Sequence, residues 1–221
     1  MRLVLLSDTH GLHREMMMNI PDGDLLVHAG DFCAEGEVAE TRSFREFFRG
    51  LPHPHKVAIT GNHDRCLEAD PSLGAEIFAG CHYLLDSGVE IGGVTFRGSP
   101  WQPWFFDMGF NLERGVELRE KWELIPAHVD VLITHAPPHG VLDGTGTGEN
   151  VGCEELRAAT RRTCPRLHVF GHIHQARGWE RLGSTLHVNA SNCAGRDERL
   201  NSVLVVVLPA GGDAVIATQA P

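Results

Sequence analysis

The chain begins MRLVLLSDTH, and this stretch already indicates a class of fold. Residues 2–6 are apolar after Arg2 and read as a short buried strand, which Asp8, Thr9 and His10 follow almost at once. The same arrangement, a short apolar run and then polar residues, returns along the chain. It predicts strands over 24–27, 57–60, 129–134, 167–170 and 185–188, and further strands over 89–91, 94–97, 202–208 and 214–218.

Helical periodicity fills some of the intervals between these strands. The range 37–50 spaces Phe44 and Phe48 as one face of a helix would, and 113–124 and 153–163 also read as helices. Strands that alternate with helices early, followed by strands alone, predict an α/β fold of two packed sheets with helices outside. Since no internal repeat or long Gly/Pro/Ser linker divides the chain, we expect a single domain over residues 1–221.

The composition is that of a soluble globular protein. The 221 residues carry a formal net charge of −10 and are 42% hydrophobic. Without a basic face, this charge argues against a stable nucleic-acid complex and against binding to an anionic membrane. The longest apolar run, 203–208, is far shorter than a membrane span. We therefore expect a cytoplasmic protein, either a monomer or a homodimer.

Five polar motifs each follow the end of a predicted strand. They are Asp8-Thr9-His10, Gly30-Asp31, Gly61-Asn62-His63-Asp64, Thr134-His135 and Gly171-His172-Ile173-His174. Because ligands of open α/β sheets collect at the carboxyl ends of the strands, we expect these motifs to converge on one site. Oxygen and imidazole donors without thiolate suit Mn, Fe, Zn, Co or Ni rather than calcium. The seven candidate metal ligands are Asp8, His10, Asp31, Asn62, His135, His172 and His174.

The order of these motifs, D-x-H, G-D, G-N-H-D, H and G-H-x-H, resembles that of the calcineurin-like metallophosphoesterases. The segments GSPWQPWF (98–105) and THAPP (134–138) resemble a narrower branch, the brain protein 239-like metallophosphoesterase-domain proteins. The likeness covers about residues 4–195 and implies a four-layer α/β/β/α sandwich, in which two mixed sheets are flanked by helices. One departure is Asp64, where that branch tends to have Glu.

The resemblance also implies how the site is organised around two divalent transition-metal ions, with Mn as our first choice and Fe, Zn, Co or Ni as alternatives. The first ion would be held by Asp8, His10, Asp31 and His174. The second would be held by Asp31, Asn62, His135 and His172, so that Asp31 bridges the two. The catalytic residues would be His63, which faces the phosphate and the leaving oxygen, and Asp64, which fixes the tautomer of His63.

Together these features predict a metal-dependent phosphoester hydrolase. We expect a phosphodiesterase that acts on cyclic or short nucleotides or similar small phosphodiesters, by attack of a hydroxide bridging the metals while His63 assists the leaving group. Two alternatives stay open: a phosphomonoesterase with the same site, and a catalytically idle protein that binds metal or nucleotide. A nearby aromatic cluster is either core or a wall for a nucleobase; it consists of Trp101, Trp104, Phe105 and Phe106.

Overall fold

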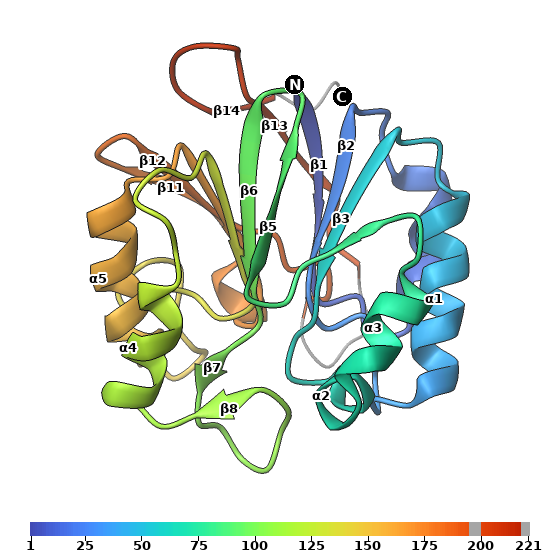
Figure 1. The fold of residues 1–221 in the computed structure, drawn as a ribbon, viewed down its shortest axis with the longest axis horizontal. Helices are drawn as coiled ribbons and strands as arrows, with labels where there is room; N and C mark the ends of the chain where they lie inside the picture. The colour runs from blue at the N-terminus through green and yellow to red at the C-terminus, as the bar shows by residue number, and fades with distance from the viewer. Residues whose placement is uncertain (195–199, 218–221) are drawn as a thin grey trace.

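The computed structural model describes residues 1–194 and 200–217, in which two six-stranded sheets pack face to face between helices (Figure 1). The first sheet has the order β14-β13-β1-β2-β3-β4. Strands β1 to β4 are parallel, β13 pairs antiparallel with β1, and β14 pairs antiparallel with β13 at the edge of the sheet. The strands are β1 (Arg2–Leu6), β2 (Leu25–Ala29), β3 (His55–Ile59), β4 (His82–Tyr83), β13 (Leu204–Val207) and β14 (Val215–Ile216).

The second sheet has the order β11-β12-β10-β9-β6-β5. Its four inner strands are parallel, and the edge strands β5 and β11 are antiparallel to their neighbours. The strands are β5 (Ser87–Ile91), β6 (Val94–Ser99), β9 (Val131–Thr134), β10 (Leu167–Phe170), β11 (Gly178–Leu182) and β12 (Thr185–Asn189). A separate parallel pair, β7 (Gln102–Pro103) and β8 (Asn111–Leu112), lies at the end of the sandwich toward which β1 runs (Figure 1).

Helices cover the outer face of each sheet (Figure 1). The first sheet is covered by α1 (Val38–Gly50) with α2 (Arg65–Ala69) and α3 (Pro71–Ile77), and the second by α4 (Val116–Glu123) and α5 (Glu154–Thr163). Within the part of the chain that the structure describes, two 3₁₀ helices, η1 (Leu12–Asn19) and η2 (His174–Ala176), complete the regular structure.

The alternation of side chains along β1 explains the four layers. Leu3 and Leu5 point into the core between the sheets, where they join Val169 of β10. Val4 and Leu6 point the opposite way, into the core beneath Phe44 of α1. Because both faces of the strand are buried, its sequence is continuously apolar rather than alternating. A third cluster, which includes Trp122 and Leu156, fixes α4 and α5 to the second sheet.

The predicted four-layer α/β/β/α architecture is confirmed, and the differences concern single elements. The helix predicted over 113–124 begins only at Val116, and of the strand predicted over 214–218 only Val215 and Ile216 form one, residue 218 lying outside the described residues. Strand β11 was not predicted, because GWERL pairs along one edge and leaves most of its side chains partly or fully exposed. In the described residues no helix combines the length and apolar character that crossing a membrane requires.

Candidate metal centre

The five motifs meet where the carboxyl ends of strands from both sheets lie side by side. Asp8 follows β1, and its backbone N–H donates to the carbonyl of Gly30, which follows β2, at 2.9 Å. In the second sheet, the N–H of Gly171 after β10 donates to the carbonyl of His135 after β9 at 3.0 Å. These bonds tie neighbouring motifs together before any side chain is considered. The expected convergence on one site is therefore found.

Four of the candidate ligands have a left-handed backbone conformation, which residues other than glycine seldom adopt. Their φ angles are 52° at Asp8, 42° at His10, 58° at Asp31 and 68° at His172. Each lies in the loop that follows a strand and contributes its side chain to a cluster of candidate ligands. Such conformations cost free energy and gather at functional sites. The backbone is thus shaped around this group of side chains.

Glycine is required beside the ligands because there is no room for a larger residue. A β-carbon on Gly171 would overlap Oδ2 of Asp8 and Oγ of Ser7. A β-carbon on Gly61 would overlap Oδ1 of Asp31. The glycines that precede the ligand positions therefore let the two carboxylates lie directly against the backbone of neighbouring motifs.

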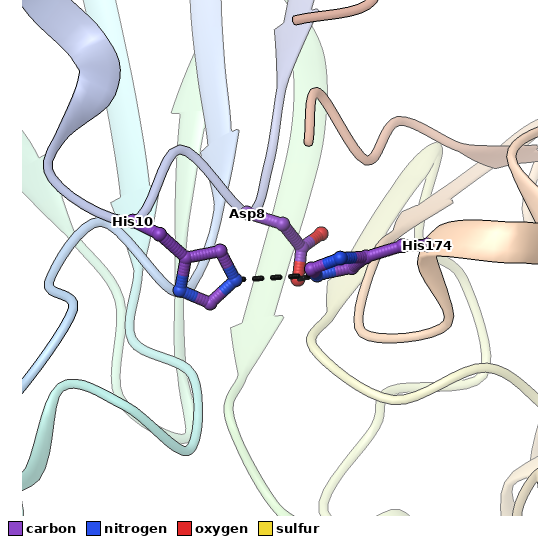
Figure 2. A group of neighbouring side chains, drawn as sticks. All are labelled: Asp8, His10 and His174. Atoms are coloured by element: carbon purple, nitrogen blue, oxygen red, sulfur yellow. Dashed lines mark hydrogen bonds and ion pairs between the residues drawn. The ribbon is translucent and has the colours of Figure 1, made fainter. Parts of the chain in front are cut away.

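Asp8, His10 and His174 form the first cluster of donor atoms, with their ligand atoms within 4.8 Å of one another. Nε2 of His174 lies 3.2 Å from Nε2 of His10 and 3.4 Å from Oδ1 of Asp8. Figure 2 shows the two imidazoles pointing toward each other from opposite sides, with the carboxylate beside them. This cluster joins a loop of the first sheet to one of the second.

Asp31, His135 and His172 form the second cluster, again within 4.8 Å. Nε2 of His135 lies 3.3 Å from Oδ2 of Asp31 and 2.9 Å from Oδ1 of Asn62. The amide oxygen of Asn62 therefore lies beside His135 and Asp31, so that one cation could bind all three groups. The group His135, Asp31 and Asn62 is buried.

Asp31 lies between the two clusters. Its Oδ2 is 3.3 Å from Nε2 of His135 and 4.0 Å from Nε2 of His10. Its Oδ1 accepts the backbone N–H of His63 at 2.8 Å. The ring of His63 completes a third cluster, with ligand atoms of His10 and Asp31 within 4.8 Å. The two carboxylate oxygens thus have different surroundings, and Oδ2 faces both clusters.

Backbone carbonyls orient three of the imidazoles. Because a carbonyl oxygen only accepts, the Nδ1 atom bonded to it carries the hydrogen, and Nε2 is left for the site. Neutral Nε2 is a form in which histidine binds a metal ion. The three pairs are His10 with Cys33 at 3.3 Å, His63 with Ala34 at 2.6 Å, and His135 with Ala29 at 3.0 Å.

Asp64 does not hold His63, and the expected role in fixing its tautomer is wrong. The Nδ1 atom of His63 is bonded to Ala34 instead. The buried carboxylate of Asp64 folds back into the turn that contains it and accepts three backbone N–H groups. These belong to Asp31 at 2.9 Å, Cys33 at 2.9 Å and Gly61 at 2.8 Å. Asp64 therefore positions the loops that carry Asp31 and Asn62.

The electrostatics of the cluster favour anionic carboxylates. Burial raises the pKa of Asp31, but the charge and hydrogen bond of His135, together with the charges of neighbouring histidines such as His10, outweigh burial and hold this pKa below its usual range. Burial likewise raises the pKa of Asp8, and the hydrogen bond and charge of His174 bring it well below the usual value. Anionic carboxylates are the form that binds cations.

The histidines divide into two groups. Burial lowers the pKa of His172 to about 3, and it also lowers that of His10, so both imidazoles are neutral near pH 7. Burial lowers the pKa of His135, but the charge and hydrogen bond of Asp31, together with the charge of Asp8 and the bond to Ala29, overcome burial and raise this pKa to about 9. A cation that binds His135 must therefore displace a proton. Oxygen and imidazole donors of these charges fit divalent transition-metal ions.

Residues after β12 support the site, and the sequence analysis missed them. Oγ of Ser191 donates to Oδ2 of Asp8 at 2.8 Å. Oδ1 of Asn192 accepts the backbone N–H of Ser7 at 3.1 Å. The signal that identified the other motifs was present here too, since Asn189-Ala190-Ser191-Asn192 places polar residues at the end of a buried strand.

Comparison with known proteins agrees with this geometry. Residues 1–176 match the calcineurin-like phosphoesterase family. The chain belongs to this family. As a calcineurin-like phosphoesterase, it is a metal-dependent hydrolase of phosphoesters. A human relative, metallophosphoesterase domain-containing protein 1, is 42% identical over 233 residues, which cover 94% of this chain and 71% of the relative.

Solved structures share the fold of this calcineurin-like phosphoesterase at much lower identity. The protein TT1561 of Thermus thermophilus superposes with a TM-score of 0.61 at 13% identity, covering 87% of this chain and 90% of that one. A structure described as a novel archaeal phosphodiesterase has a TM-score of 0.51 at 16% identity, covering 98% of this chain and all of the other, 100%. At these identities the likeness concerns the fold alone.

Proposed function

We propose that this protein is a phosphodiesterase that uses two divalent metal ions to cleave cyclic or short nucleotides or similar small phosphodiesters. The observation that carries the proposal is the position of Asp31 between two clusters of donors, with Oδ2 4.0 Å from His10 Nε2 and 3.3 Å from His135 Nε2. A carboxylate in that position suits a pair of cations that share it. Each remaining cluster then provides the other donors of one ion.

The proposed ligands of the first ion are Asp8, His10, Asp31 and His174. Those of the second are Asp31, Asn62, His135 and His172. Divalent cations at such a site supply Lewis acidity and activate water for attack on phosphorus. Our choice is Mn, with Fe, Zn, Co or Ni as alternatives, because carboxylate, amide and imidazole donors without thiolate suit these metals.

His63 is the proposed proton donor to the leaving oxygen. Its Nδ1–H donates to the carbonyl of Ala34 at 2.6 Å, which fixes the orientation of the ring. Nε2, the other ring nitrogen, is left available to the leaving group. The backbone N–H of His63 also holds Oδ1 of Asp31, so the acid and the proposed bridging residue have a fixed relation.

Several broader predictions accompany this proposal. The core shared by both sheets supports one domain over residues 1–221, since strands from early and late in the chain contribute to it. The preference for diesters is supported by the resemblance to the brain protein 239-like branch, and one protein of the same fold is described as a phosphodiesterase. Cytoplasmic location and a monomeric or homodimeric state stay predictions.

Turnover of bis-p-nitrophenyl phosphate and of p-nitrophenyl phosphate tests the proposal. Chelated protein would be reloaded separately with Mn, Fe, Zn, Co or Ni before assay. We expect faster turnover of the diester, dependence on added metal, and the highest rate with Mn. Preference for the monoester would identify a phosphomonoesterase with the same site. Two bound metals without turnover of either substrate would favour the idle binding protein.

A further inference from the structure

The loop between β7 and β8 exposes aromatic rings to solvent. Trp104, Phe105 and Phe106 are 60%, 48% and 67% exposed, whereas the other phenylalanines of the described residues are buried. Trp101 differs from them: its indole N–H donates to Asp86 at 2.8 Å, and its ring packs against the third core cluster. Of the aromatic cluster identified in the sequence, Trp101 thus packs against the core, whereas the other three rings are exposed to solvent.

The side chain of Asn111 makes several hydrogen bonds that hold the exposed loop in place. The amide nitrogen of Asn111 donates to the carbonyls of Phe105 at 3.4 Å, Phe106 at 2.9 Å and Met108 at 3.0 Å. Its Oδ1 accepts from the N–H of Phe105 at 3.2 Å and from Nε2 of Gln102 at 2.9 Å. Phe106 also has a left-handed φ of 48°. A loop held this way presents its rings in a fixed arrangement, which lowers the entropy cost of binding.

The same loop contacts the candidate metal centre at two points. The ring of Phe105 lies 5.9 Å from the ring of His172, centroid to centroid, at an interplanar angle of 90°. The N–H of Gly109 donates to the carbonyl of Asn62 at 3.0 Å. Phe106 packs edge to face on Phe105 with centroids 4.5 Å apart. The exposed rings therefore begin at a proposed ligand and extend away from it.

We propose that Phe105 and Phe106 stack the planar base of a nucleotide whose phosphate occupies the metal centre; this rests on the proposed function. The carboxylates, imidazoles and metals recognise phosphate and leave the rest of the substrate without a partner. Aromatic faces accept any base, because every base has a π face. The side-chain amide of Asn111 is occupied by the loop, so it does not read base edges. Phe105 and Phe106 accordingly favour nucleotides over other phosphoesters without favouring one base.

Equilibrium binding separates the base from the phosphate. Metal-loaded protein would be titrated with adenosine 5′-monophosphate and with inorganic phosphate in a calorimeter. Phe105→Leu and Phe106→Leu keep an apolar side chain but remove the π face. We expect each to weaken binding of the nucleotide by roughly 5- to 150-fold, the range for stacking of one base, and to leave phosphate binding within about twofold. Phe105→Trp, which keeps an aromatic ring, should bind the nucleotide about as tightly as the unsubstituted protein.

A matched control removes an aromatic ring elsewhere: Trp179→Leu on β11, where Trp179 is 55% exposed. It should leave both affinities unchanged. Unchanged nucleotide affinity in Phe105→Leu and Phe106→Leu would overturn the proposal. An equal loss of affinity for nucleotide, phosphate and metal would also overturn it, because Phe105 would then act only by supporting His172. A change in oligomeric state alone would assign the rings to an interface. Failure of the proposed function is distinguishable, because the unsubstituted protein would then not hydrolyse bis-p-nitrophenyl phosphate preferentially, whatever the effect of Phe105→Leu and Phe106→Leu on nucleotide affinity.

Discussion

The Nε2 atoms of His10 and His174 lie 3.2 Å apart, although 164 residues separate them in the chain. One residue follows β1 in the first sheet, and the other opens η2 after β10 in the second. Their meeting, beside Asp8, depends on how the two sheets pack. The site is therefore sensitive to changes in either half of the protein.

Replacement of Asp31 is expected to remove both metal ions together. Asp31→Ala deletes the carboxylate that faces both clusters, so metal analysis after saturation with Mn²⁺ should give fewer than one ion per chain, against two for the unsubstituted protein. Metal should also raise the melting temperature of the unsubstituted protein. At a metal concentration 100 times the Kd, binding adds about 2.7 kcal/mol to the free energy of unfolding. Asp22→Ala, an exposed carboxylate, is the control and should keep both ions. Retention of one full ion in Asp31→Ala would contradict the bridging role.

Replacement of His63 should reduce the rate without removing metal. We expect His63→Ala to bind two ions and to lose roughly 10²–10⁴-fold in kcat, the usual contribution of a positioned acid. The loss should be smaller for a p-nitrophenolate leaving group than for an alkoxide, because the former hardly needs a proton. His128→Ala removes an exposed histidine and should have no effect. Equal losses for both leaving groups would indicate that His63 binds phosphate only.

Asp64 should behave differently from His63. Asp64→Ala leaves three buried N–H groups without an acceptor, each at a cost of about 1–3 kcal/mol. The expected result is a lower melting temperature and weaker metal binding, measured by calorimetry on chelated and reloaded protein. The dependence of rate on the leaving group should stay as in the unsubstituted protein. A leaving-group dependence like that of His63→Ala would restore Asp64 as the partner of His63.

Two glycine substitutions form a matched pair. Gly171→Ala places a methyl group on Asp8 and Ser7, so we expect loss of metal binding and a strongly destabilised fold. Gly144 has open space around its α-carbon. Gly144→Ala should therefore be neutral or stabilise by about 0.4–1 kcal/mol, since alanine restricts the unfolded chain. Urea unfolding of both variants checks the contrast, and a Gly171→Ala protein with normal stability and metal content would show that the loop can move aside.

Acid should destabilise the protein through buried histidines outside the candidate metal centre. Burial lowers the pKa of His28 to about 3 and that of His187 to about 4, and it brings the pKa of His168 well below 6.5. The unfolded chain binds these protons near pH 6.5, and the folded protein does not. The stabilisation is therefore complete above pH 6.5 and is lost as the pH falls toward 4.

Urea unfolding of chelated protein between pH 4.5 and 7.5 measures this dependence. His168→Gln cannot take up a proton, so the slope of unfolding free energy against pH should fall by up to about 1.4 kcal/mol per pH unit. An unchanged slope in His168→Gln would mean that His168 is protonated in the folded protein.

The architecture and the candidate ligands were predictable from the sequence for local reasons. A strand buried on both faces must be apolar at successive positions, as residues 3–6 are, and the end of such a strand is visible where polar residues begin. Asp8, Asp31 and His135 could be identified because five motifs share that position; any one of them alone would have indicated only a turn or a core residue. The family resemblance added the pairing of ligands with ions, which the spacing does not contain.

Only the tertiary structure decided which atoms meet. The sequence places Asp64 next to His63, yet Ala34 receives the Nδ1–H of His63 and Asp64 binds backbone amides instead. The contact between Phe105 and His172 is likewise absent from any local pattern. The direction of a side chain and its partner depend on backbone turns and on packing between distant segments. A sequence therefore reveals which residues stand at the ends of strands, and the packing of the two sheets determines what each of them touches.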